Sequence, residues 1–112
     1  MGKILVINND NDTMSLLKIW LEKKAYDVKY TSSGDNIPQL VKSFEPDLVL
    51  VDVLQKEAAK EIKANEETSQ IPVILMTGYT SRNTPLEAIV DDTIEKPFDL
   101  PLLEKKIEKL IS

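Results

Sequence analysis

Two short apolar runs constrain the fold more than any other feature of the sequence. Residues 4–7 and 48–51 are entirely apolar, and a polar residue, Asn8 or Asp52, follows each run directly. Runs of this length without a polar member are typical of strands that are buried on both faces of a parallel sheet. Weaker patterns predict three more strands, at residues 26–30, 71–76 and 93–94. The first of these alternates apolar and polar residues, so we expect it at an edge of the sheet.

Apolar residues at helical spacing separate the predicted strands. They predict helices near residues 14–21, 37–44, 54–67 and 100–110. The charge run within residues 56–67 is interpreted as a solvated helix face. A capping box at residues 84–87 begins a further helix that can extend only to about Val90, so we expect it to be short. Asp10 and Asp99 stand at N-cap positions of the first and last helices.

Alternation of strands and helices predicts the architecture. Five strands alternating with five helices favour a single α/β domain over residues 1–112, with a parallel sheet and helices on both faces. In open sheets of this kind, functional residues lie at the carboxyl ends of the strands. This rule selects the residues after the first, third, fourth and fifth strands, namely Asn8, Asn9, Asp10, Asp52, Thr77 and Lys96. A carboxylate, a hydroxyl and a lysine are therefore expected at one edge of the sheet.

Composition limits the chemistry that this edge can perform. The chain has no Cys and no His, which excludes disulfides, thiolate nucleophiles, Cys/His zinc sites and imidazole bases. Its formal net charge of -5 disfavours direct binding to nucleic acid, which needs a basic surface. The apolar run at residues 4–7 is too short for a signal peptide or a membrane span. We therefore expect a cytoplasmic protein without membrane association.

Four segments of the sequence carry a family resemblance. They are KILVINND at 3–10, PDLVLVD at 46–52, IPVILMT at 71–77 and EKPFDL at 95–100. Together they resemble the receiver domain of bacterial two-component response regulators, in order and over essentially the whole chain. The resemblance implies a flavodoxin-like sheet with strand order 2-1-3-4-5.

The resemblance also implies a phosphorylation switch. A histidine kinase or phosphotransfer protein, or a small phosphodonor, would transfer a phosphoryl group to Asp52 while Mg²⁺ neutralises charge. Lys96 would contact the phosphoryl oxygens, and Thr77 would swing to hydrogen-bond the phosphoryl group. The chain would not be an enzyme beyond self-catalysed phosphoryl acceptance and loss. It would signal to a downstream protein or to a fused output domain.

The expected metal site departs from the family pattern. The family has an acidic pair where this chain has Asn8 and Asn9, and an amide oxygen brings no charge to a cation. The implied ligands are Asp52, Asn9, Asp10 and the carbonyl of Leu54, although an N-cap role is the preferred interpretation of Asp10. Because Mg²⁺ sheds water reluctantly, we expect its binding to be weak or absent.

Two classes of function stay open at this point. A phosphoryl-accepting receiver is favoured by Asp52, Thr77 and Lys96. A pseudo-receiver, which binds proteins without phosphorylation, is favoured by the paired asparagines, by the short segment after Asp52, and by Thr93 where the family has a switch aromatic. The chain could stand alone or form part of a longer regulator.

Overall fold

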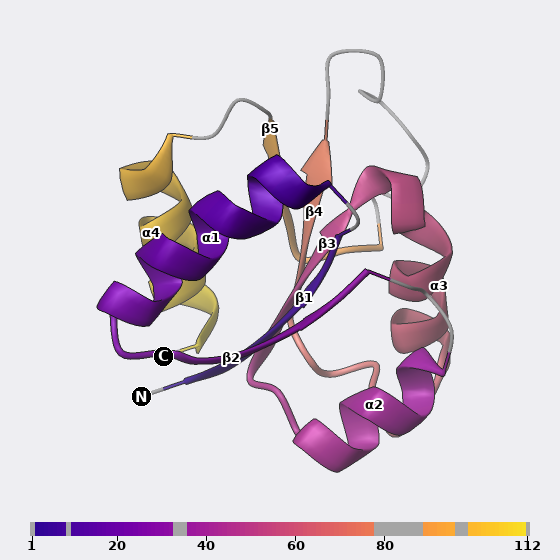
Figure 1. The fold of residues 1–112 in the computed structure, drawn as a ribbon. Coiled ribbons are helices and arrows are strands. Elements are labelled where there is room, and N and C mark those ends of the chain that lie inside the picture. The colour runs from indigo at the N-terminus through magenta and orange to yellow at the C-terminus, as the bar shows by residue number, and fades with distance from the viewer. Residues whose placement is uncertain (1, 9, 33–35, 78–88, 96–98, 112) are drawn as a thin grey trace.

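The computed structural model describes every residue except 1, 9, 33–35, 78–88, 96–98 and 112. The described residues form a five-stranded sheet (Figure 1). Its strands are β1 (Lys3–Ile7), β2 (Asp27–Thr31), β3 (Leu48–Asp52), β4 (Val73–Thr77) and β5 (Asp92–Glu95). All neighbouring strands are parallel, and their order is β2-β1-β3-β4-β5. The predicted order and the flavodoxin-like class are confirmed.

Helices cover both faces of the sheet, as the sequence predicts. The described helices are α1 (Asn11–Lys23), α2 (Ile37–Phe44), α3 (Lys56–Ala64) and α4 (Leu100–Ile111), with a 3-10 turn η1 (Val53–Gln55) before α3. Helices α1 and α4 lie on one face, and α2 and α3 lie on the other (Figure 1). Within the described ranges, none of the helices is both long and apolar enough to cross a membrane.

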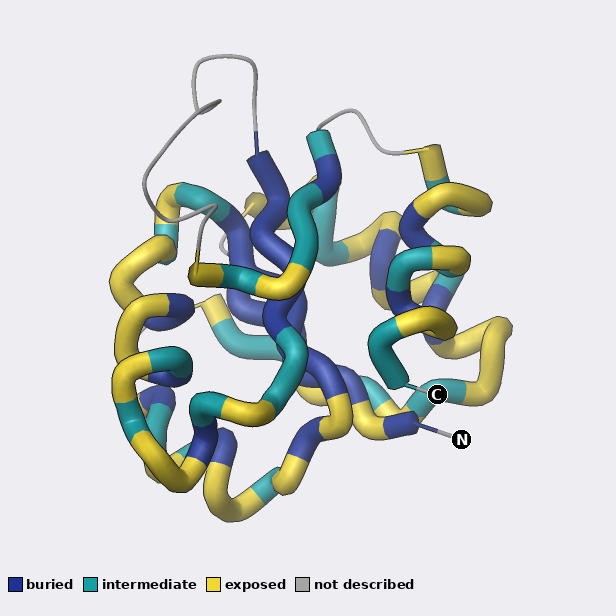
Figure 2. The backbone as a smooth tube through the Cα atoms, turned by 180° about the vertical axis from the view of Figure 1, so that it is seen from behind, coloured by how far each residue is buried: buried dark blue, intermediate teal, exposed yellow. Residues whose placement is uncertain are grey.

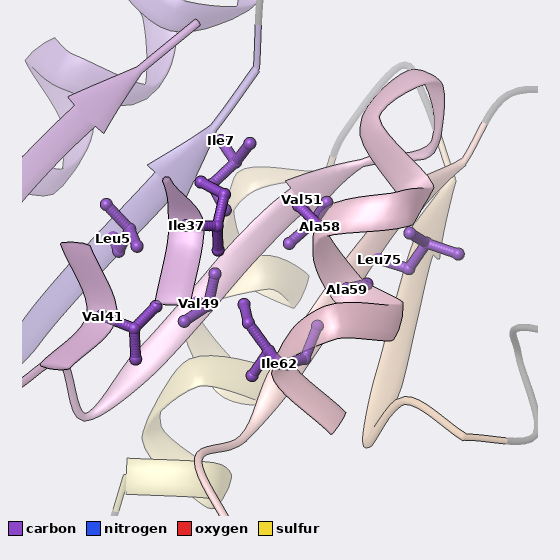
Figure 3. Close-up of a cluster of buried hydrophobic side chains, with 11 residues drawn as sticks. Leu5, Ile7, Ile37, Val41, Val49, Val51, Ala58, Ala59, Ile62 and Leu75 are labelled. Carbon is purple, nitrogen blue, oxygen red and sulfur yellow. The ribbon is translucent and has the colours of Figure 1, made fainter. Parts of the chain in front are cut away.

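The uninterrupted strands divide the core into two layers. On the α2/α3 face, a cluster of buried residues packs beneath the helices (Figure 3), and it comprises Leu5, Ile7, Ile37, Val41, Val49, Val51, Ala58, Ala59, Ile62, Val73 and Leu75. The α1/α4 face buries Ile4, Val6, Leu17, Leu21, Leu48, Leu50, Ile74, Met76, Ile94, Leu103 and Ile107. Figure 2 shows that the central strands are buried while the outer sides of the helices are exposed. Burial on both faces fixes the carboxyl ends of β1, β3 and β4 relative to one another.

The third helix ends earlier than predicted. It stops at Ala64 rather than near Glu67, because Asn65 has an extended backbone with φ −93° and ψ 123°. The Asn65 side-chain oxygen accepts a hydrogen bond from the Glu67 N–H at 2.9 Å. The Asn65 side chain thus stabilises a turn, and this turn competes with continuation of the helix. The solvated-face interpretation is also wrong for Lys63, whose side chain is only 12% exposed.

The segments before β4 and before β5 also differ from the sequence prediction. Strand β4 begins two residues later than predicted, at Val73, which follows Pro72, a residue with no N–H for the sheet. The short helix predicted over residues 85–90 lies largely outside the described residues. The described part of that span, Ile89 and Val90, forms a turn and a bend rather than a helix.

Tyr30, in the edge strand β2, makes the stability of the protein depend on pH in the alkaline range. Its hydroxyl oxygen is buried and has no hydrogen-bond partner in the described part of the chain. Burial, followed by the nearby charge of Glu22, raises the pKa of Tyr30 to about 12. The ordinary tyrosine pKa is about 10, so between these values the folded protein holds a proton that the unfolded chain has lost. The contribution of the protonated Tyr30 hydroxyl to the free energy of unfolding is fully present below about pH 10 and is lost as the pH rises toward about 12.

We therefore expect the free energy of unfolding to fall as pH rises from about 10 to about 12. Denaturant titrations at several pH values measure this dependence. The Tyr30→Phe variant should show a shallower decline, because it lacks the titrating hydroxyl. Identical pH profiles for the two proteins would contradict the assignment to Tyr30.

Candidate functional site

Asp52 ends β3 at the carboxyl edge of the sheet. The strand pairs with β1 and β4 on its two sides, and Asp52 itself is in register with Met76. Its side chain is only 1% exposed. The carboxylate oxygen Oδ1 accepts a hydrogen bond from the Leu54 N–H at 2.8 Å, which caps the turn η1. A backbone donor therefore holds one oxygen of this nearly buried carboxylate in place.

Asn8 follows β1 and is fully buried. Its backbone N–H donates to the carbonyl of Thr31 at 3.0 Å. Its side-chain Oδ1 accepts from the Asp10 N–H at 2.8 Å. The amide nitrogen Nδ2 is buried and has no hydrogen-bond partner among the residues described. Buried polar groups without partners are uncommon in folded proteins, so this donor needs an explanation.

Asn8 and Asp52 lie at equivalent positions of adjacent strands. Ile7 is in register with Val51, and each of the two polar residues follows directly after this pair. Neighbouring strands in a sheet lie about 4.8 Å apart. The sheet register thus brings the buried amide beside the buried carboxylate. The strand-end rule selected Asn8 from the sequence, but it did not identify the side-chain amide as a buried donor.

Asp10 acts as the N-cap of α1, which confirms the preferred interpretation of this residue. Its Oδ1 accepts from the Asp12 N–H at 3.1 Å, and its Oδ2 accepts from the Thr13 hydroxyl at 2.7 Å. Its backbone carbonyl accepts from the Met14 N–H at 2.9 Å. Both carboxylate oxygens therefore take part in capping, which stabilises the positive end of the helix.

Thr77 is the last residue of β4 and is buried at the same edge of the sheet. It is in register with Glu95 of β5. Its hydroxyl donates to the carbonyl of Ile94 at 3.5 Å, which is long for an O–H···O hydrogen bond. The hydroxyl is thus held only weakly by this contact. The structure places Asn8, Asp52 and Thr77 at the carboxyl ends of three adjacent strands, β1, β3 and β4.

The remaining predicted site residues are placed differently or lie outside the described part. Leu54 lies in η1, where its N–H reaches Asp52 and its side chain is 77% exposed. Asn9 and Lys96 lie outside the described residues. Lys96 follows Glu95, the final residue of β5, in the sequence. Thr93 lies within β5 and is half-buried.

The described donor set fits Mg²⁺ poorly. In the described ranges, no group of three or more His, Cys, Asp or Glu residues could hold a metal ion. Mg²⁺ prefers hard, charged oxygen ligands in octahedral geometry. The oxygen of Asn8 is engaged by the Asp10 N–H, and both carboxylate oxygens of Asp10 cap α1. Of Asn8, Asp10 and Asp52, only Asp52 therefore brings a carboxylate that takes no part in capping α1.

The strand order β2-β1-β3-β4-β5 thus brings the Asp52 carboxylate and the Thr77 hydroxyl to the carboxyl ends of two adjacent parallel strands. Residues 4–108 match the sequence model of the response regulator receiver domain. The chain therefore belongs to the response regulator receiver domain family, which acts in two-component signalling.

Curated relatives support this assignment. The transcriptional regulatory protein CpxR of Escherichia coli (strain K12) is 34% identical over 116 residues, covering 99% of this chain and 50% of that protein. The regulator RpaA of Synechocystis sp. is 26% identical over 119 residues, covering 99% of this chain and 49% of that protein. The chain thus spans about half the length of these curated relatives.

Solved structures resemble the chain closely in fold. The response regulator TrrA of Thermotoga maritima, determined in complex with Mg²⁺-BeF, has a TM-score of 0.87 and 26% identity, covering 98% of this chain and 99% of that one. A response regulator of Chloroflexus aurantiacus has a TM-score of 0.89 at 21% identity, covering 98% and 97% of the two chains. At that lower identity, the likeness concerns the fold alone.

Proposed function

We propose that this chain is a receiver domain over residues 1–112 that accepts a phosphoryl group on Asp52. The observation that carries the proposal is the nearly buried Asp52 carboxylate at the end of β3, with its Oδ1 held by the Leu54 N–H at 2.8 Å. A fixed carboxylate oxygen at the carboxyl edge of a parallel sheet suits attack on phosphorus. Phosphoryl transfer is mostly a matter of positioning and charge stabilisation, which such an edge can supply.

In the proposed reaction, one carboxylate oxygen of Asp52 forms a bond to the phosphorus of a phosphorylated donor. The bond from phosphorus to the donor atom breaks, and the leaving group departs with that electron pair. Hydrolysis by water later returns the free carboxylate and inorganic phosphate. The chain would catalyse only its own phosphorylation and dephosphorylation, so it would not be an enzyme acting on separate substrates.

Two other side chains have proposed roles in this reaction. Thr77 is weakly held, by a 3.5 Å hydrogen bond to the Ile94 carbonyl, so its hydroxyl can turn to donate to a phosphoryl oxygen. Lys96 follows β5 directly in the sequence, and its ammonium group would supply positive charge to the same oxygens. Mg²⁺, if it binds, would do so weakly and would neutralise further charge.

The proposed partners follow from the chemistry of a phosphoryl acceptor. A histidine kinase or a phosphotransfer protein would supply the phosphoryl group. The output would be a downstream protein or a domain fused to this one, since this chain spans about half of relatives such as the transcriptional regulatory protein CpxR. The acidic composition argues against direct contact of this domain with nucleic acid. We place this signalling in the cytoplasm.

Intact-mass analysis after incubation with acetyl phosphate tests the proposal. We expect the mass of one phosphoryl group to be added to the wild-type protein and not to the Asp52→Asn variant. The asparagine keeps an oxygen acceptor for the Leu54 N–H, so the variant should fold normally, as circular dichroism would show. Asp27→Asn, an exposed change at the start of β2, is the matched control and should retain labelling.

Labelling of Asp52→Asn at the wild-type level would contradict the choice of acceptor. Absence of labelling in the wild-type protein, with kinase-borne as well as small phosphodonors, would instead favour a phosphorylation-independent binding module.

A further inference from the structure

We propose that the Asn8 side-chain amide is a hydrogen-bond donor for an anionic phosphate group at the carboxyl edge of the sheet, where it replaces part of the charge stabilisation that a divalent cation would supply. This inference rests on the proposed function, because the bound group would be the phosphoryl group carried by Asp52. It assigns direct stabilisation of the phosphoryl group to a residue at which the family pattern has an acid.

The hydrogen-bond network determines the orientation of the Asn8 amide. The Asp10 N–H lies 2.8 Å from one end of the amide, and an N–H requires an acceptor, so that end is the oxygen Oδ1. The other end must then be the nitrogen, which carries two N–H donors. The nitrogen is buried without a partner among the residues that the structure covers. A fixed, desolvated donor is therefore available beside Asp52.

The alternation of the strands places the donor and the acceptor on the same side of the sheet. In β1, Ile4 and Val6 face the α1/α4 layer, and Asn8 is the next residue of this alternating series. In β3, Leu48 and Leu50 face the same layer, and Asp52 continues their series. Both side chains therefore leave adjacent strands in the same direction.

The chemistry of an amide donor differs from that of the acid it replaces. A carboxylate at this position would repel a phosphoryl group unless a cation stood between them. Amide N–H groups instead attract phosphoryl oxygens, and hydrogen bonds to ionised acceptors are the stronger ones. Donors that are fixed before the reaction stabilise developing negative charge without having to reorganise. The poor fit of the described donor set to Mg²⁺ agrees with such a role.

The Asn8→Asp variant tests this inference most directly. Aspartate has the same shape and keeps the oxygen that accepts from the Asp10 N–H, but it replaces the two donors by an anionic oxygen. The matched control is Asn65→Asp, because the Asn65 oxygen makes the same kind of turn contact, with the Glu67 N–H at 2.9 Å, away from the site. The initial rate of labelling by acetyl phosphate is measured by intact mass, in EDTA and then in Mg²⁺.

We expect acetyl phosphate to label the wild-type protein and Asn65→Asp in EDTA, and we expect Mg²⁺ to increase the initial rate of labelling only slightly. Asn8→Asp should label at least about tenfold more slowly than wild type in EDTA and recover when Mg²⁺ is added. A purely structural role for Asn8 would not produce this change in metal dependence. The inference is overturned if the wild-type protein requires Mg²⁺ and Asn8→Asp labels at the same rate under both conditions.

A second measurement separates this inference from the proposed function. The side-chain amide signals of Asn8 in a ¹⁵N NMR spectrum are assigned by their loss in Asn8→Asp. Labelling of the wild-type protein with acetyl phosphate should shift these signals as Asp52 becomes phosphorylated. If intact mass shows that Asp52 is labelled and the signals do not move, the amide is not the donor, although the proposed function stands.

Discussion

Truncation of Leu50 to alanine is expected to lower the free energy of unfolding by about 3 kcal/mol. Leu50 lies in the middle of the central strand β3 and is fully buried. It is in register with Val6 on one side and Ile74 on the other, within the core layer beneath α1 and α4. Alanine would remove buried apolar contacts on the same strand that ends in Asp52, and the sheet cannot collapse easily around the resulting cavity.

Denaturant unfolding monitored by circular dichroism measures this loss. Leu54→Ala is the matched control, because Leu54 lies on the same segment four residues later with its side chain 77% exposed. The control should change stability by less than about 0.5 kcal/mol. Equal losses in the two variants would show that the burial of β3 has been assigned incorrectly.

The second large effect is expected at Lys63, where the change to methionine should lower stability by about 2 kcal/mol. The Lys63 ammonium donates to Asp91 Oδ2 at 2.6 Å, to the Ile71 carbonyl at 2.9 Å and to the Ser69 carbonyl at 3.1 Å. The same Asp91 oxygen accepts from the Val73 N–H at 2.8 Å. Methionine keeps most of the apolar volume but leaves these oxygens without their cation. Because Asp91 is 37% exposed, water should replace part of the interaction, and the loss should be smaller than for a fully buried pair.

Lys60→Met on the same helix provides the control for this prediction. Lys60 pairs with Glu57 at 3.4 Å, but its side chain is 51% exposed. Exposed pairs of this kind contribute between zero and about 1 kcal/mol, so thermal and denaturant unfolding should change little. A loss at Lys60 equal to the loss at Lys63 would contradict the view that burial and the two carbonyl contacts make Lys63 important.

The strands could be predicted from the sequence because burial on both faces leaves few alternatives for runs such as residues 4–7 and 48–51. The contacts of Lys63 could not be predicted in the same way. Lysine in a charged helical segment is usually solvated, and nothing in the local sequence indicates that Asp91 lies beside it in the fold. Long-range pairing of this kind depends on how α3 and the start of β5 pack. That arrangement is a property of the tertiary structure.

The candidate site, too, could be predicted from the sequence only in part. The topology rule correctly places Asp52 and Thr77 at one edge, because the carboxyl ends of parallel strands meet there. The capping role of Asp10 followed from its position before α1. The buried donor of Asn8 could not be predicted, because the sequence does not show which end of an amide is already engaged.

Gly2 and Ile111, the first and last described residues, lie together, and Gly2 directly precedes β1 at the amino ends of the strands. A Cβ atom built on Gly2 would lie 2.9 Å from Cδ1 of Ile111. Any domain joined to either end would therefore be tethered near the amino ends of the strands, about 13 Å along β3 from Asp52. A linker that starts there begins at the opposite end of β3 from the Asp52 side chain. A change at Asp52 would have to reach a joined domain mechanically, through the packed strands and helices. Alternatively, the joined domain would fold back and contact a surface of this one.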